Sequence, residues 1–224
     1  MFHNFPVSHR SDIFVLAIDV DLTLVDSLTP WLEHVSTEEK RFTLHDIPEP
    51  SPDEVTDLVH WFHEMGVSDP LEYWKGDIYS QHYGCEVNRS FKNFYRQLVH
   101  QIAFHTGKKV ETIVVSSCFP EHENSKRDLV KRVFKVDTPF ISTSAKHMVD
   151  FDLIIDDSLG VAFNCLMAGK NVLHAPSPLA IPSVGTRMNP HFFHPGYDGK
   201  SWPYNWDSVE ANELVKELLK ISNK

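Results

Sequence analysis

The chain has 224 residues, of which 42 % are hydrophobic and 23 % charged, a composition typical of a folded globular protein and not of a disordered one. Its 21 Lys and Arg side chains against 31 Asp and Glu give a net charge of −10. This acidic balance argues against a protein that grips long nucleic acid through its phosphates. The length predicts one core domain with a substantial insertion.

The start of the chain and the cysteines bear on where the protein works. The first twelve residues are polar and do not resemble a secretory signal. The longest apolar run, Ile13–Ile18, is too short to span a bilayer. Cys85, Cys118 and Cys165 are widely spaced and form neither a disulfide framework nor a metal knuckle. We therefore expect a cytoplasmic protein with no membrane partner, and the oligomeric state stays open.

The first half of the chain begins with a predicted strand, Ile13–Ile18, whose continuous apolar run is typical of a strand covered on both faces. Two helical patterns follow. One starts with Ser-Pro-Asp-Glu at 51–54, which resembles a helix N-cap with a capping box, and the other spans roughly Ser90–His105 and ends before Gly107. Because one crossover helix needs far fewer than 85 residues, we predict that residues 27–111 form a helical cap inserted into a core domain.

Apolar strands and helical patterns alternate through the second half of the chain. The predicted strands are Thr112–Ser116, Pro139–Ser142, Asp152–Ile155 and Asn171–His174, and the predicted helices are 121–134, Ser158–Ala168 and one from about Ser208. Such alternation predicts an α/β fold with a doubly wound parallel sheet, built from residues 1–26 and 112–224.

Two acidic pairs follow predicted strands. Asp19 and Asp21 come directly after the first strand, and Asp156 and Asp157 end the fourth. Because the carboxyl ends of parallel strands lie at one edge of a sheet, the four carboxylates are expected to converge. Such a cluster favours a hard divalent cation with oxygen ligands, and Mg²⁺ fits best. The alternative is that one pair caps the helix that follows it.

A serine and a lysine complete this constellation. Ser116 ends the second predicted strand, where its hydroxyl and the backbone N–H groups beyond it can hold a phosphate oxygen. Lys146 precedes Asp156 by ten residues and can neutralise a phosphoryl group. Together with the acidic pairs, these residues favour a site for a small phosphorylated substrate.

The order Asp19-x-Asp21-x-Thr23, Ser116, Lys146, Asp156-Asp157 resembles the four motifs of the haloacid dehalogenase (HAD) superfamily, over roughly residues 12–26 and 110–176. The resemblance implies a HAD-type Rossmann-like core in which Asp19 is the nucleophile and forms an aspartyl-phosphate. It implies that Asp21 is the general acid and base, braced by Thr23, which makes a phosphatase the expected activity.

The same resemblance implies the ligands. Mg²⁺ would be bound by Asp19, Asp21 and one or both of Asp156 and Asp157. The phosphate-binding group would consist of Thr23, Ser116, Ser117 and Lys146.

Among HAD phosphatases, the spacing is most similar to that of the 5′(3′)-deoxyribonucleotidases, which share a Ser/Thr pair after the second strand and a Trp-containing segment such as 202–207. This similarity implies a (deoxy)nucleoside monophosphate as substrate. Two alternatives stay open. One is a HAD phosphatase that acts on a sugar phosphate or on a nucleic-acid 3′-phosphate, and the other is a non-catalytic protein that binds a phosphorylated ligand.

The predicted cap is rich in aromatic residues. The stretch from Tyr73 is less periodic than the helices, so we expect Tyr73, Trp74 and Tyr79 to face the substrate, where stacking on a base contributes about 1–3 kcal/mol. The aromatic residues at helical spacing are expected to form the core of the cap; these are Phe62, Phe91, Phe94 and Tyr95. A basic group is expected to form one solvated helix face; it consists of Lys126, Arg127, Lys131 and Arg132.

Overall fold

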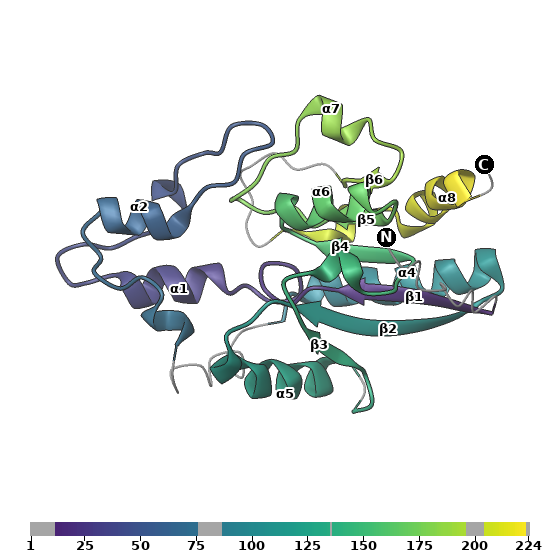
Figure 1. Cartoon of the computed structure of the whole chain (residues 1–224), viewed down its shortest axis with the longest axis horizontal. Helices are drawn as coiled ribbons and strands as arrows, with labels where there is room; N and C mark the ends of the chain where they lie inside the picture. The colour runs from purple at the N-terminus through teal and green to yellow at the C-terminus, as the bar shows by residue number, and fades with distance from the viewer. Residues whose placement is uncertain (1–11, 76–86, 135, 196–203, 223–224) are drawn as a thin grey trace, which may run out of the picture.

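A computed structural model describes residues 12–75, 87–134, 136–195 and 204–222. Its centre is a six-stranded sheet in the order β3-β2-β1-β4-β5-β6, in which every neighbouring pair is parallel (Figure 1). The strands are β1 Ile13–Ile18, β2 Lys109–Ser116, β3 Phe140–Ser142, β4 Leu153–Asp156, β5 Asn171–His174 and β6 Phe192–Phe193. The predicted doubly wound α/β fold is confirmed.

Helices cover both faces of this sheet. Within the described residues the α-helices are α1 Leu28–Val35, α2 Leu58–Glu64, α4 Arg89–Thr106, α5 Glu123–Val133, α6 Leu159–Met167, α7 Val184–Arg187 and α8 Ala211–Ser222. Successive side chains of a strand point to opposite faces. Leu16 and Ile18 of β1 accordingly share a hydrophobic cluster with α4, α5 and α8, whereas Ala17 belongs to a second cluster with α6. Among the described residues, no helix is long and apolar enough to cross a membrane.

β3 and β4 match the prediction to within one residue at each end, and two other strands differ more. β2 begins at Lys109 and not at Thr112, because it pairs with β1 along the whole length of that strand, from Ile13 opposite Lys109 onward. The polar side chains in its first half, joined by a Lys109–Glu111 ion pair of 2.9 Å, hid this extension. The short edge strand β6 was not predicted, because two residues between prolines carry no pattern.

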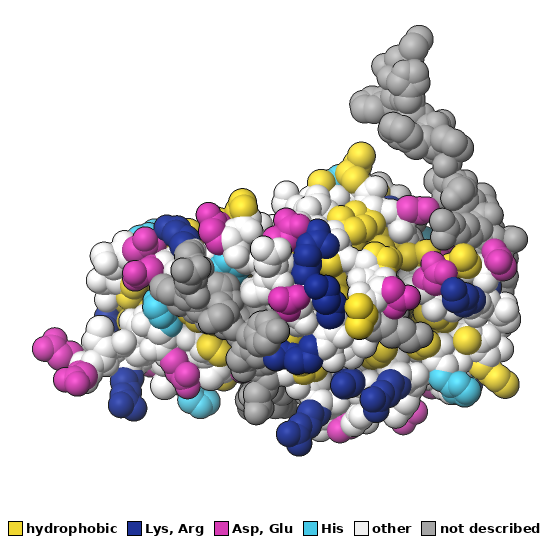
Figure 2. All heavy atoms as spheres, turned by 90° about the horizontal axis from the view of Figure 1, so that it is seen from below, with side chains coloured by type: hydrophobic (Ala, Val, Ile, Leu, Met, Phe, Trp, Pro, Cys, Tyr) yellow, Lys and Arg dark blue, Asp and Glu magenta, His cyan; other side chains and the backbone are white. Residues whose placement is uncertain are grey.

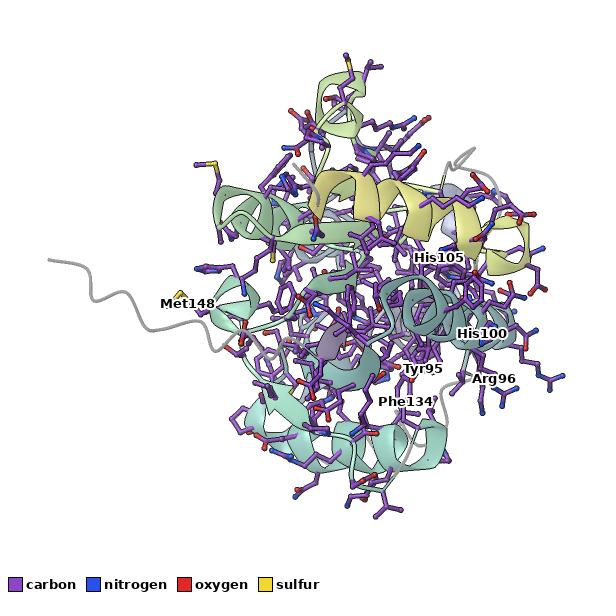
Figure 3. All side chains as sticks on the ribbon, turned by 90° about the vertical axis from the view of Figure 1, so that its right-hand side faces the viewer. Tyr95, Arg96, His100, His105, Phe134 and Met148 are labelled. Carbon is purple, nitrogen blue, oxygen red and sulfur yellow. The ribbon has the colours of Figure 1, made fainter. Side chains whose placement is uncertain are left out.

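Helix α4, which the prediction places in the inserted cap, packs on the sheet. Its buried side chains belong to the same cluster as β1; they are Phe91, Phe94, Leu98 and Ile102. Phe94 stacks on Trp206 with ring centroids 4.8 Å apart. Tyr95 donates or accepts a 2.8 Å hydrogen bond with Thr112 of β2, and Figure 3 shows it between α4 and α5, near Phe134. An apolar stripe predicts a buried helix face, but not which surface buries it.

The first helix predicted within the insertion begins later in the structure, where it is preceded by α1. α2 starts at Leu58, and the side chain of its N-cap residue Asp57 accepts a 3.0 Å hydrogen bond from the His60 N–H. The capping box predicted at 51–54 is therefore wrong. Asp53 instead adopts a left-handed conformation with φ 65°, and its carboxylate contacts a distant loop described below.

Residues between Leu28 and Trp74 have a hydrophobic cluster of their own. Its buried members are Leu28, Trp31, Leu32, Val35, Phe42, Leu58, Trp61, Phe62 and Tyr73. Figure 1 shows α1 and α2 beside the sheet and not over either face. We call residues 27–75, which contain this cluster, the cap.

Candidate active site

Asp19 and Asp156 lie side by side at the carboxyl edge of the sheet, as their positions after β1 and at the end of β4 predict. The backbone N–H of Asp19 donates to the carbonyl of Ile155 at 2.9 Å, which fixes the two strand ends relative to each other. Carboxylate oxygens of Asp19, Asp156 and Asp157 all lie within 4.8 Å of one another. These three side chains can therefore hold a metal ion.

Lys146 lies between two of these carboxylates. Its Nζ is 2.8 Å from Asp19 Oδ1 and 2.7 Å from Asp156 Oδ2, and its side chain is buried. Burial alone would lower the pKa of Lys146, but the charges of Asp19 and Asp156 outweigh burial and raise it. Lys146 is therefore held as an ammonium group that faces both carboxylates.

The three carboxylates carry more negative charge than Lys146 neutralises. Burial raises the pKa of Asp156 to about 6, and the nearby Asp19 charge adds to this effect while Lys146 opposes it. Burial and the charges of Asp156 and Asp19 raise the pKa of Asp157 well above its usual range. A divalent cation would compensate this charge with oxygen ligands, so the residues present fit Mg²⁺.

The helix-capping alternative for the acidic pair holds only in part. Asp156 Oδ1 accepts a 2.9 Å hydrogen bond from the N–H of Ser158. The cap of α6 is Ser158 itself, whose hydroxyl accepts from the Val161 N–H at 3.3 Å. The second carboxylate oxygen of Asp156, Oδ2, accepts a hydrogen bond from Lys146, so the helix N-terminus uses only one of its two oxygens.

Lys126 of α5 is a site residue that the sequence analysis placed wrongly in a solvated helix face. Its side chain is 2 % exposed. The Nζ contacts the Asp21 carboxylate and donates to Ser116 Oγ at 3.1 Å and to the Ser117 carbonyl at 2.9 Å. One signal could have found it: Lys126 shares a helical stripe with the buried Leu129 and Val130.

The other basic residues of α5 lie outside the site; Lys131 and Arg132 are exposed, whereas Arg127 is half-buried and packs on the Phe140 ring of β3. Arg127 and Lys131 form ion pairs with Glu123 and Asp128 of the same helix, at 2.6 and 3.0 Å. Figure 2 looks at the underside of Figure 1, where α5 lies, and shows Lys and Arg side chains there interspersed with acidic and apolar ones.

The hydroxyl residues are arranged unequally around the site. Ser116 is buried at the end of β2, where its hydroxyl accepts a hydrogen bond from Lys126. Ser117 is exposed and lines a cavity. Thr23 is buried, but its hydroxyl makes no hydrogen bond within the described part of the chain. Thr23 was expected to brace Asp21, but its hydroxyl makes no hydrogen bond to Asp21 in the structure.

A cavity of about 370 Å³ adjoins Asp21 and Lys126, the two charged side chains that line it among the described residues. The rest of its wall is mainly apolar, and includes Leu22, Leu28, Trp31, Trp74, Phe119 and Leu179. The indole N–H of Trp31 donates to the Pro70 carbonyl at 2.7 Å, so this ring is held in place.

Of the three aromatic residues expected to face a substrate, Trp74 lines this cavity. Tyr73 does not line it: its side chain is 3 % exposed and packs in the cap, with its ring 4.8 Å from that of Trp74. Tyr79 lies outside the described residues.

The buried His174 and the half-buried His194 next to it predict a loss of stability in acid. Burial lowers the pKa of His174 to about 3 and that of His194 to about 4, with nearby positive charge adding to both shifts. Below pH 6.5 these rings bind protons in the unfolded chain but not in the folded state. The free energy of unfolding therefore decreases as the pH is lowered. At pH 5.0 each histidine is expected to cost about 2 kcal/mol relative to pH 7.5.

Urea unfolding at these two pH values measures the effect. In His174→Gln the loss between pH 7.5 and 5.0 should be smaller by about 2 kcal/mol. An unchanged pH dependence in this variant would show that His174 is protonated in the folded protein.

Solved structures similar to this chain include three haloacid dehalogenase-like hydrolases. That from Xanthomonas campestris is 13 % identical, with 95 % of this chain and 99 % of the other covered and a TM-score of 0.47. That from Streptococcus pneumoniae is 14 % identical, with coverage of 82 % and 94 % and a TM-score of 0.47. A putative one from Burkholderia xenovorans is 16 % identical, with coverage of 93 % and 98 % and a TM-score of 0.43.

Sequence comparisons add nothing to this, since no family model and no curated protein matches the chain. At such identities and scores, the structural likenesses carry no information about activity.

Proposed function

We propose that the chain is a cytoplasmic, Mg²⁺-dependent phosphomonoester hydrolase of the HAD type, with the cap as a separate substrate-covering unit. One observation carries the proposal: carboxylate oxygens of Asp19, Asp156 and Asp157 lie within 4.8 Å of one another, and Lys146 bridges two of them. A non-catalytic binding protein has no need to crowd three carboxylates, two of them buried, because their mutual repulsion is costly.

Asp19 is the nucleophile in this proposal. Its carboxylate attacks phosphorus, the bond to the leaving oxygen breaks, and Asp21, which binds a proton from solvent before this step, donates that proton to the leaving oxygen. Asp21 then takes a proton from a water molecule, which attacks the aspartyl-phosphate and releases phosphate and the free Asp19 carboxylate. Lys126, in contact with Asp21, keeps that carboxylate next to Ser116 and Ser117.

The transferred phosphoryl group is bound by residues from three strand ends. Ser116, Ser117 and the backbone beyond β2 contact one side, and Lys146 supplies a positive charge from the other. Thr23 lies in the loop after β1, and of the proposed phosphate-binding residues it has the least support, because its hydroxyl makes no hydrogen bond within the described residues. Bound Mg²⁺, held by Asp19, the Asp21 carbonyl, Asp156 and Asp157, would neutralise charge on the phosphoryl oxygens.

The cavity favours a (deoxy)nucleoside monophosphate over a sugar phosphate. Apolar and aromatic walls, with Trp31 and Trp74 among them, suit a flat and weakly polar leaving group. The hydroxyls of a sugar would find few partners on these walls, because the uncharged polar side chains there are mainly Ser27, Ser117 and His122, and unpaired hydroxyls are unfavourable.

Phosphate release from a panel of phosphomonoesters, with Mg²⁺ and with EDTA, tests the proposal. We expect phosphate release in the assays with Mg²⁺ and none in those with EDTA, and the fastest release from nucleoside monophosphates. Release from sugar phosphates ahead of nucleotides would keep the chemistry and contradict the substrate. A full panel without release, alongside tight binding of inorganic phosphate, would favour the non-catalytic alternative.

A further inference from the structure

A loop that follows β5 reaches the cap from the sheet side. Ser177 and Ala180 pair across a tight turn, and both are buried. Leu179 lies in this turn, where its N–H donates to Ser177 Oγ at 3.2 Å. Its side chain packs against the cap cluster and lines the cavity beside Asp21. The loop therefore supplies part of the cavity wall from outside the cap.

Residues 52–56 of the cap hold this loop. The Thr56 N–H donates to the Leu179 carbonyl and the Asp53 N–H to the Ile181 carbonyl, both at 2.8 Å. Isolated β-bridges join Pro52 to Ile181 and Val55 to Ala180. Figure 1 shows the segment that leads to α7 extending from the sheet toward the cap.

Asp53 closes the contact at its far end. Its Oδ1 accepts from the Ser183 N–H and from the Thr186 hydroxyl, both at 2.8 Å. Burial alone would raise the pKa of Asp53, but these hydrogen bonds outweigh it and lower that pKa. The residue holds a left-handed φ of 65°, which a non-glycine residue rarely adopts and which other contacts must stabilise.

We propose that residues 177–186 are a specificity loop, in which Leu179 sets the size of the leaving-group cavity and Asp53 is a positioning residue that clamps the loop to the cap. The inference rests on the proposed phosphomonoester hydrolase. The clamp attaches the cap to a loop that follows β5, at a point far along the chain from the connection between the cap and β1. The cavity is thereby organised before substrate binds, which lowers the entropy cost of binding.

Leu179→Ala tests the wall of the cavity. The substitution should raise KM for 1-naphthyl phosphate about tenfold, since apolar contact with the leaving group is lost. Turnover of acetyl phosphate, whose leaving group is two carbons long, should change less than about twofold. Met188→Ala, at a 78 % exposed position just beyond this loop, is the matched control and should leave both substrates unaffected. Equal effects of Leu179→Ala on both substrates would overturn its specificity role.

Two variants of Asp53 separate its hydrogen bonds from its backbone conformation. Glycine tolerates a positive φ but removes the acceptor, so Asp53→Gly should raise KM for 1-naphthyl phosphate as Leu179→Ala does and leave kcat nearly unchanged. Asparagine tolerates the same φ and keeps a side-chain oxygen, so Asp53→Asn should behave like the wild type. An unchanged KM in Asp53→Gly, or an equal fall in kcat for both substrates, would overturn the clamp.

Binding measurements distinguish failure of this inference from failure of the proposed function. If no ester is hydrolysed, the proposed function fails. Calorimetry of 1-naphthyl phosphate and of inorganic phosphate then decides the inference. About tenfold weaker binding of the naphthyl ester in Leu179→Ala and Asp53→Gly, with phosphate binding unchanged, supports the specificity loop. Unchanged binding of the naphthyl ester overturns it.

Discussion

Asp19→Asn is expected to lower the rate of phosphate release by more than about a thousandfold, the scale on which removal of a nucleophile acts. An amide oxygen is a poor nucleophile, and the substitution also removes one carboxylate from the cluster with Asp156 and Asp157. The fold should persist, because asparagine has nearly the same volume and Lys146 keeps its 2.7 Å contact with Asp156. Phosphate release and thermal unfolding of the same preparation measure both effects.

Asp150→Asn is the control for this experiment, since Asp150 is exposed two residues before Asp152 and outside the carboxylate cluster. It should release phosphate at the wild-type rate. Activity in Asp19→Asn within tenfold of the wild type would contradict the assignment of the nucleophile.

Lys126→Met is expected to lower kcat/KM by about a hundredfold, the loss typical of removing one electrostatic contact in an active site. Methionine fills the space of the buried lysine stem, but it leaves Asp21, Ser116 and the Ser117 carbonyl without the cation that joins them. Asp21 retains 23 % exposure of its side chain, so water can solvate its charge and the variant should still fold. Steady-state kinetics with thermal unfolding as a fold control measures the loss.

Lys131→Met makes the same chemical change on the outer face of α5, where Lys131 pairs with Asp128 and its side chain is 51 % exposed. This control should keep kcat/KM within about twofold, because surface ion pairs contribute little. Equal activities of the two variants would mean that Lys126 has a structural role alone.

The sheet and the carboxylate cluster were predictable because each depends on a local signal. Continuous apolar runs fixed β1 and β4, and the topology of a parallel sheet brings Asp19 and Asp156 to one edge. Lys146 needed the motif order as well, because a loop lysine alone carries no signal. The structure then adds the distances that make the cluster a candidate metal site.

The features missed by the sequence analysis depend on tertiary contacts. The stripe of α4 predicted burial correctly, but its partner is β1 and not a cap. Lys126 interrupts an apolar stripe with a charge, and its partner Asp21 is 105 residues away in the chain. The Asp53 carboxylate likewise accepts a hydrogen bond from the N–H of Ser183, which is 130 residues away in the chain. No local pattern can anticipate such pairings, because they arise only after the sheet brings distant segments together.

Chemical trapping of a phosphorylated residue tests the central claim most directly. The protein is mixed with a phosphomonoester and Mg²⁺, quenched in acid, reduced with borohydride and digested for mass spectrometry, which converts an aspartyl-phosphate to homoserine. We predict homoserine at position 19, and none there when substrate is omitted or in Asp19→Asn. Phosphate release by a protein that carries no trapped modification at Asp19, or carries it at another carboxylate, would contradict the account.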